Sequence, residues 1–454
     1  MGSFLQTAAP KYLTPAARIE LEKSLVTRLD LQDENFEQAF EKMLGAKREQ
    51  DSDVDAVVST IIADVRTRGD EALIDLTKKF DRLELTPQTL QISKEEIAAA
   101  VNSITDEDRE ALILARDRIR SHHEKQLPVD TRYVDPIGVE LGSKWTAIEA
   151  VGLYVPGGTA SYPSSVLMNG VPAKVAGVDR VVMVVPTPDG IINPLVLAAA
   201  ELAGIDEIYR IGGAQAVAAL AYGTKTIAPV SKIVGPGNAF VAAAKRQVFG
   251  TVGIDMIAGP SEVLIVADAD NNPDWIALDL LAQAEHDKNA QSILITDSKS
   301  LADAVAEAVE RQLITLPRAE IAGASWQDFG TIITVPTLEE ALPLTNAIAA
   351  EHLEIATADP EAFFAGVRNA GAVFLGKHTP EAVGDYVGGS NHVLPTARSA
   401  KFSSGLSVLD FVKRTSILKC GPEQLAKIGP AAVTLANAEG LQAHGRSVSI
   451  RMNH

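Results

Sequence analysis

Two polar side chains that can bind a metal ion stand together near the end of an apolar helical segment. The segment begins at Asn272, which is followed by a proline in a typical helix start, and it ends near His286. Gln283 and His286 are three residues apart, so on a helix they share a face and can reach one point. Such a pair is half of a metal site, although a core histidine satisfied by local hydrogen bonds gives the same pattern. Because the segment is apolar on nearly every side, including Trp275 and Leu278, we expect it to be buried.

Glu351 and His352 form a second pair, placed between a predicted helix that ends at Ala350 and a short predicted strand. Catalytic groups are over-represented in loops next to strands. An adjacent carboxylate and imidazole can divide the roles of acid and base if both face one cavity. An exposed charged pair at a helix end is the alternative that the sequence leaves open.

Asp385 and His392 lie in a glycine-rich stretch that can fold tightly around a point. A set of two His, one Asp and one Gln oxygen suits Zn²⁺ and leaves positions for a substrate. Near the C-terminus, His444 follows Glu439 by five residues on a predicted helix, so the two need not share a face. A polar helix surface is the alternative interpretation of this last pair.

Glycine-rich loops that follow predicted strands could accommodate a nucleotide. They are Gly152 to Gly158, Gly212-Gly213 and Gly235-Pro236-Gly237-Asn238. None has the Gly-x-Gly-x-x-Gly spacing of a dinucleotide fingerprint, and the sequence has no Walker lysine motif. The nucleotide signal of these loops is therefore weak.

The elements that must position these residues change in character along the chain. Helices are predicted at 54–80, 94–104 and 106–123, after a polar helical arm. From residue 151 onwards, short apolar strands alternate with helices, which predicts parallel sheets with helices on both faces. In such sheets ligands bind beyond the carboxyl ends of the strands, where the glycine-rich loops fall.

We therefore expect an α/β fold with two parallel-sheet units. The expected boundaries are a helical arm at 1–50, a discontinuous first α/β domain at 51–153 with 261–400, a second α/β domain at 154–260, and a tail at 401–454. The first α/β domain would contain the Glu351–His352 pair and the other candidate active-site residues of the body.

Composition excludes several classes of protein. The chain has 454 residues and a formal net charge of -18, which argues against a nucleic-acid or anionic membrane surface, because phosphate binding needs clustered Lys and Arg. The single cysteine, Cys420, excludes an intrachain disulfide and suits a reducing compartment. No secretory signal is evident, and no apolar run reaches the ~20 residues that span a membrane. We expect a cytoplasmic protein.

From the residues alone, these patterns indicate an enzyme, either a metal-dependent dehydrogenase or a hydrolase. Taken together, they also resemble the histidinol dehydrogenase family from about residue 35 to the C-terminus. The segments that carry the resemblance are Gly152 to Gly158, Gly212 to Ala216, Val234 to Asn238, Asp255 to Glu262, Gln283 to His286, Glu351 to Leu353, Gly384 to Thr396, Ser403 to Leu406 and Glu439 to His444. Several segments in the family's order are far more specific than any single motif.

The resemblance implies a role for each matching residue. The family's ligands of one Zn²⁺ per subunit match Gln283, His286, Asp385 and His444. Its acid/base pair matches Glu351 and His352. Its substrate contacts match Ser261, Gln283, His286, His352, Asp385, Glu439 and His444. Its NAD contacts match Tyr154, Gln215 and Asn238.

The resemblance also implies an activity and an assembly. The activity is the four-electron oxidation of L-histidinol to L-histidine through L-histidinaldehyde, at the end of histidine biosynthesis, with NAD bound on an incomplete Rossmann-like unit. In that reaction His352 takes the hydroxyl proton as hydride leaves, and Glu351 activates the water that adds to the aldehyde. The assembly is a homodimer in which the tail crosses over, so that Glu439 and His444 complete the other subunit's site.

Three other functions stay open at this point. A relative that oxidises another small alcohol would keep the zinc and NAD machinery and differ at anchoring positions such as Glu439, whose carboxylate suits an amine. A non-catalytic binding protein would not need the Glu351–His352 pair. A metal-dependent hydrolase would show no NAD dependence. Because Cys420 lies outside every motif, a thiohemiacetal intermediate is not expected.

Overall fold

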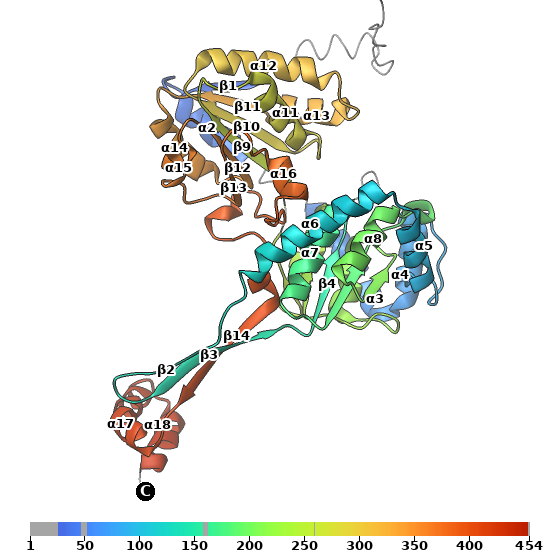
Figure 1. The fold of residues 1–454 in the computed structure, drawn as a ribbon. Coiled ribbons are helices and arrows are strands. Elements are labelled where there is room, and N and C mark those ends of the chain that lie inside the picture. The colour runs from blue at the N-terminus through green and yellow to red at the C-terminus, as the bar shows by residue number, and fades with distance from the viewer. Residues whose placement is uncertain (1–25, 47–51, 158–161, 258, 453–454) are drawn as a thin grey trace, which may run out of the picture.

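The computed structural model describes residues 26–46, 52–157, 162–257 and 259–452. Within them lie a six-stranded sheet, a five-stranded sheet and a three-stranded ribbon (Figure 1). Both larger sheets are parallel and are flanked by helices, so the predicted α/β class is confirmed. None of the helices in this part of the chain is both long and apolar enough to cross a membrane.

The six-stranded sheet has the order β1-β11-β10-β9-β12-β13. Its strands are β1 (Thr27–Asp30), β9 (Glu262–Ala267), β10 (Gln291–Thr296), β11 (Thr331–Thr334), β12 (His352–Ala356) and β13 (Ala372–Leu375). In β9, Val263 and Ile265 face α11 (Pro273–Ala284), α12 (Lys299–Leu313) and α13 (Ala319–Phe329). Leu264 and Val266 face the opposite side, with α2 (Phe36–Gly45), α14 (Leu338–Ile348) and α15 (Pro360–Phe364). Such a strand is apolar along its whole length because helices cover both faces of the sheet.

The five-stranded sheet has the order β6-β5-β4-β7-β8. Its strands are β4 (Ala150–Tyr154), β5 (Arg180–Val184), β6 (Glu207–Tyr209), β7 (Lys232–Val234) and β8 (Gly253–Ile254). One face is covered by α3 (Ser52–Arg68), α4 (Asp70–Asp81), α9 (Gly213–Tyr222) and α10 (Ala239–Val248). The other is covered by α5 (Lys94–Ser103), α6 (Asp106–Glu124), α7 (Pro163–Val175) and α8 (Pro194–Ala203).

The antiparallel ribbon pairs β3 (Glu140–Ala147) with β2 (Thr131–Val134) and β14 (Val412–Lys419). It reaches away from both sheets and carries α17 (Pro422–Ala438) and α18 (Gln442–Ser449) at its far end (Figure 1). Large apolar side chains stay exposed along this extension; they include Val134, Leu418, Leu435 and Ile450, exposed at 66%, 67%, 64% and 65%. An extension of this kind does not bury its apolar surface within its own chain.

The packing corrects two of the expected boundaries. Within the arm expected at 1–50, the described residues begin at Val26, and β1 is a strand that pairs with β11. The helices between 52 and 124 cover the five-stranded sheet, so 51–153 does not group with 261–400. The apolar residues of these helices, such as Val58 and Val65, are buried against strands that follow them in the chain, and helical periodicity does not say which sheet a helix will cover.

The expectation that the helix from 272 is buried all round is wrong at two positions. Trp275 and Leu278 on α11 are 45% and 43% exposed, and the Trp275 ring packs against His378. The face that includes Ile276, Leu280 and Leu281 is buried. Helix α11 therefore covers one face of a sheet and keeps its other side open.

An ion pair at the amino edge of the five-stranded sheet gives a stability prediction. Arg180 donates to Glu207 at 2.6 and 3.1 Å, and this interaction lowers the pKa of Glu207 although partial burial opposes it. A folded-state pKa below the unfolded value adds stability above the unfolded pKa and loses it as pH falls through the folded one. We expect Glu207→Gln to reduce the free energy of unfolding by about 1 kcal/mol at neutral pH, after discounting for solvent screening.

The same reasoning predicts that the difference in free energy of unfolding between wild type and Glu207→Gln shrinks towards zero at acid pH. Urea unfolding of both proteins at neutral pH and near pH 3 measures this difference. A difference that stays constant with pH would contradict an electrostatic origin.

Candidate active site

The Glu351–His352 pair lies at the amino edge of the six-stranded sheet, where β9 and β12 begin side by side. Both residues are buried, at 5% and 4% exposure. The backbone of Glu262 contacts both: its N–H donates to Glu351 Oε2 at 2.9 Å, and its carbonyl oxygen lies 3.1 Å from His352 Nδ1. Because a carbonyl oxygen only accepts, Nδ1 is the protonated nitrogen and Nε2 is free to accept a proton.

The side of the ring with the free nitrogen faces Asp385. His352 Nε2 lies 3.6 Å from Asp385 Oδ1, and Asp385 is on α16 (Glu381–Tyr386). His392, which follows in the same glycine-rich stretch, lies 3.0 Å from the Asp385 carbonyl oxygen through Nδ1. The hydroxyl of Ser165 on α7 lies 3.3 Å from the other His392 nitrogen. His392 therefore spans from the Asp385 segment to a helix of the five-stranded unit.

Gln283 and His286 approach the same region from the C-terminal end of α11. Gln283 is fully buried, and neither polar atom of its side chain has a hydrogen-bond partner. His286 follows the helix end, and the charges of Asp385 and His352 both act on it. A buried amide with two unsatisfied atoms is costly unless a ligand completes it. The donors Gln283, His286 and Asp385 therefore fit a divalent cation such as zinc.

A complete ligand set is not formed within one chain. Among the described residues, no three His, Cys, Asp or Glu side chains are placed to hold a metal ion. The fourth predicted ligand, His444, is exposed on α18, and Glu439 is exposed where α17 ends. Figure 1 shows these helices far from α16, at the other end of the ribbon. The structure thus brings together the predicted site residues of the body and leaves those of the tail apart.

Buried carboxyl groups surround His352 on its Nδ1 side. Glu381 Oε2 and Glu351 Oε2 lie 3.7 and 3.8 Å from Nδ1. Burial raises the pKa of Glu351 to about 7 and that of Glu381 to about 8, although the charge of His352 opposes both shifts. Burial alone would lower the pKa of His352, but the carboxylates of Glu381, Glu351 and Asp385 raise it well above its usual value. These carboxylates therefore stabilise the positively charged ring that forms when Nε2 takes up a proton.

Sequence reasoning missed Glu381 and Glu262 as parts of this site. Glu381 is four residues before Asp385, and that spacing puts both on one face of a helix. The spacing was a usable signal for Glu381. Glu262 contributes through its backbone at the strand start, which no side-chain motif reports.

The predicted nucleotide-binding residues meet at the carboxyl edge of the five-stranded sheet. Tyr154 ends β4, Gln215 lies in the first turn of α9 after β6, and Asn238 precedes α10 after β7. The Tyr154 hydroxyl accepts a hydrogen bond from the Gly213 N–H at 2.9 Å. Asn238 Oδ1 caps α10 by accepting from Phe240 N–H at 3.1 Å. Tyr154 and Asn238 thus shape their loops, and all three residues lie at or just beyond the carboxyl ends of the strands.

A short stretch of chain joins the carboxyl edge of the five-stranded sheet to the amino edge of the six-stranded sheet. Strand β8 ends at Ile254 and the next strand in the chain, β9, begins at Glu262, with Ser261 immediately before it. The site on the six-stranded sheet therefore lies at the amino ends of its strands, which differs from the general expectation for such sheets. The C-terminal end of α11 reaches that edge because the helix runs antiparallel to the strands it connects.

With this geometry in place, the comparison with known families is decisive. A model of the family described as Histidinol dehydrogenase matches residues 45–452. The chain belongs to the histidinol dehydrogenase family. The match covers Glu351 and His352, the residues around Gln283 and the tail alike.

Members of the histidinol dehydrogenase family match the chain over almost its full length. The histidinol dehydrogenase of Mesorhizobium japonicum is 71% identical over 421 residues, which are 93% of this chain and 98% of the relative. That of Brucella abortus is 67% identical over 94% of this chain and 100% of the relative. The crystal structure of histidinol dehydrogenase from Elizabethkingia anophelis superposes with a TM-score of 0.89 at 37% identity, covering 94% of this chain and 98% of that one.

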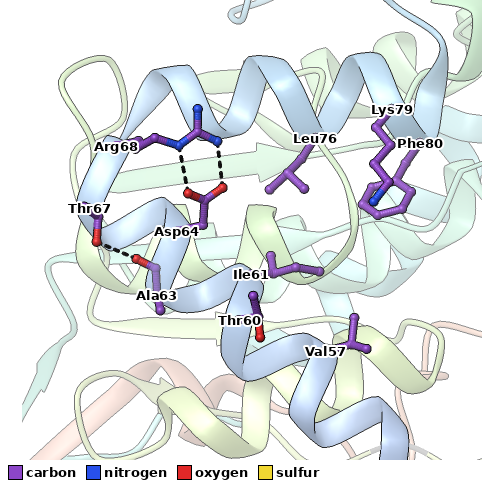
Figure 2. A pocket seen from close by; sticks show the side chains of 10 residues that line it. All are labelled: Val57, Thr60, Ile61, Ala63, Asp64, Thr67, Arg68, Leu76, Lys79 and Phe80. Atoms are coloured by element: carbon purple, nitrogen blue, oxygen red, sulfur yellow. Dashed lines mark hydrogen bonds and ion pairs between the residues drawn. The ribbon is translucent and has the colours of Figure 1, made fainter.

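A separate groove of about 620 Å³ lies between α3 and α4 (Figure 2). It is lined by Val57, Thr60, Ile61, Ala63, Asp64, Thr67, Arg68, Leu76, Lys79 and Phe80. Asp64 and Arg68 form an ion pair at 2.8 Å, so these two charges satisfy each other. The groove belongs to the five-stranded unit, whereas Glu351 and His352 lie at the edge of the six-stranded sheet. It is not the candidate active site.

Proposed function

We propose that this protein oxidises L-histidinol to L-histidine through L-histidinaldehyde, with NAD⁺ as the electron acceptor and one Zn²⁺ per site. The observation that carries the proposal is the buried Glu351–His352 pair, whose two side chains are held by the backbone of one residue, Glu262. Family membership supports histidinol as the substrate.

His352 acts as the base for the alcohol. Its Nδ1–H is tied to the Glu262 carbonyl oxygen, so the proton of the substrate hydroxyl goes to Nε2. The resulting positive charge is stabilised by Asp385 on one side of the ring and by Glu381 on the other, at 3.6 and 3.7 Å. The His352 side chain is 5% exposed, which keeps bulk water away from the reacting hydroxyl.

Glu351 acts on the aldehyde. Burial raises the pKa of its carboxyl group to about 7, so near neutral pH it exchanges a proton readily. The carboxylate takes a proton from the water that adds to the aldehyde, while the Glu262 N–H holds Oε2 in place. The hydrate so formed is again an alcohol, and His352 can accept its proton in a second oxidation.

Residues on the two sheet edges would hold the metal ion and the cofactor. Gln283, His286 and Asp385 of one chain would bind zinc, which when bound orients the imidazole and amine of the substrate. Tyr154, Gln215 and Asn238 would line the site of NAD⁺, which when bound accepts the hydride. Ser261, between the two edges, would contact the substrate.

A dimer would complete the site. Glu439 and His444 are exposed on a tail that extends away from its own body, and the ribbon below it leaves large apolar side chains uncovered. A second copy related by two-fold symmetry would cover this apolar surface and receive the tail at its own site. His444 would then be the fourth zinc ligand of the partner, and the carboxylate of Glu439 would bind the substrate amine.

The experiment that tests the function counts NADH formed per molecule of L-histidinol, with zinc stripped and then restored. Two NADH per histidinol, lost on stripping and regained with Zn²⁺, is the expected result. Oxidation of a different small alcohol, with no NADH formed from histidinol, would show that the substrate is wrong and that the zinc and NAD sites are right. Hydrolysis of a substrate without NAD⁺ would overturn the proposal.

A further inference from the structure

A fully buried ion pair lies beneath the loop at the carboxyl end of β7. Lys245 on α10 donates to the Asp255 carboxylate, and the two side chains are 2% and 1% exposed. Neither residue belongs to the proposed catalytic, metal, substrate or cofactor contacts. A buried ion pair is often no more stabilising than apolar residues of the same volume, so a contribution to stability does not by itself account for it.

The pair holds one residue, Gly235, by both of its backbone polar groups. The Gly235 N–H donates to Asp255 Oδ2 at 2.7 Å, and Lys245 Nζ donates to the Gly235 carbonyl oxygen at 3.0 Å. Gly235 has a φ of +110°, and a Cβ there would lie 2.2 Å from the Tyr154 carbonyl oxygen. Only glycine fits this position, and it leaves no side chain to fix the loop. The ion pair supplies that fixation.

The same pair also holds the first residues after β8. Asp255 directly follows that strand, and its Oδ1 accepts the Met256 N–H at 2.6 Å. Later in the chain, Ser261 precedes Glu262, whose backbone positions Glu351 and His352. On the other side, Gly235 leads in three residues to Asn238, the cap of α10. One ion pair thus connects the 235–238 loop to residues 255 and 256, which come shortly before Ser261 and Glu262 in the chain.

We propose that Lys245 and Asp255 are positioning residues that hold the 235–238 loop against residues 255–257, so that a bound NAD⁺ meets the substrate held at His352. The proposal rests on the proposed function of these two edges. The pair acts through the backbone of Gly235 and Met256 and does not itself touch substrate.

The test compares two double variants, each of which removes one ion pair from the five-stranded unit. Lys245→Met with Asp255→Asn removes the buried pair and keeps the interior neutral. Arg180→Met with Glu207→Gln removes a pair at the opposite, amino edge of the same sheet, where Arg180 also bonds the carbonyl oxygens of Ala228 and Pro229. A third variant, Asp255→Glu, keeps both charges and lengthens the acidic side chain. It therefore shifts the 235–238 loop relative to residue 255 without leaving Lys245 unpaired.

The readouts are the Kd of NADH by fluorescence, the KM for NAD⁺ and for histidinol, kcat, and Tm. We expect the double variant at 245 and 255 to lose about 10- to 100-fold in kcat/KM for NAD⁺ and to bind NADH more weakly, with histidinol affinity unchanged. Asp255→Glu is expected to show the same pattern to a smaller degree. The Arg180–Glu207 variant is expected to lower Tm and keep its cofactor constants within about twofold of wild type.

Unchanged NADH affinity and unchanged KM for NAD⁺ in a folded double variant or in Asp255→Glu would overturn the inference. Equal kinetic losses in both double variants would also overturn it, because they would follow from lower stability alone. NADH binding does not depend on which alcohol is oxidised. A wild-type protein that binds NADH but ignores histidinol would therefore count against the proposed substrate and leave the positioning role testable.

Discussion

His352→Asn is expected to lower kcat for histidinol oxidation by about 10²- to 10⁴-fold, the usual contribution of a general base. The amide N–H of asparagine can replace the Nδ1–H that binds the Glu262 carbonyl oxygen, so the local fold should persist. Asparagine offers no atom that can accept a proton in place of Nε2. The matched control is His378→Asn, because His378 is exposed and packs on Trp275 outside the site.

Glu351→Gln should separate the two halves of the reaction. Glutamine can still accept the Glu262 N–H through its oxygen, but it cannot take a proton from water. We expect this variant to oxidise histidinol once and to fail on supplied histidinaldehyde, again by about 10²-fold or more. Because burial raises the pKa of Glu351 to about 7, the wild-type aldehyde step should speed up as pH rises through that value.

Rapid-mixing measurements of NADH formation, starting from histidinol and then from the aldehyde, test both variants. Equal losses in the two half-reactions for Glu351→Gln would contradict a role confined to the aldehyde. A kcat for His352→Asn within tenfold of the wild-type value would show that His352 is not the general base.

Mixing two inactive variants is expected to restore activity. In a dimer with crossed tails, His352→Asn damages the body of a site and His444→Asn damages the tail that completes the other subunit's site. A mixed dimer then has one intact site and one doubly damaged site. Random pairing of equal amounts gives about half mixed dimers, and therefore about a quarter of wild-type activity.

The control mixes His352→Asn with Gln283→Ala, both of which damage the body. No mixed dimer of these two has an intact site, so their mixture should stay inactive. Co-expression with two different affinity tags isolates the mixed dimers for assay. If the His352 and His444 variants fail to complement each other while forming mixed dimers, the crossed tail is wrong.

Local patterns in the chain were sufficient for much of this site. The adjacent Glu351 and His352, the three-residue spacing of Gln283 and His286, and the glycines around Asp385 depend on short stretches. The structure places Glu351, His352, His286 and Asp385 around one region, with Gln283 buried in the last turn of the helix that leads to His286. Alternating short apolar strands and helices predicted parallel sheets for the same reason, because strand and helix periodicity is a property of neighbouring residues.

Other features depend on contacts between distant segments, and the periodicity did not report them. Strand β1 pairs with β11 about three hundred residues later, so a short segment in the expected arm became a sheet edge. Helices α3 to α6 cover a sheet whose strands follow them in the sequence. Which surface an amphipathic helix covers is decided by the packing of the whole chain.

By itself, then, the sequence determined the α/β class, and it singled out Glu351, His352 and the three candidate zinc ligands of the body, because each of these predictions depends on residue type and short spacing. Only the tertiary structure decided that Glu381 and the backbone of Glu262 surround His352, and that Lys245 and Asp255 clamp Gly235. It also placed His444 at the far end of the ribbon. These arrangements arise when strands begin side by side and bring together residues that are remote in sequence, and no local pattern encodes that register.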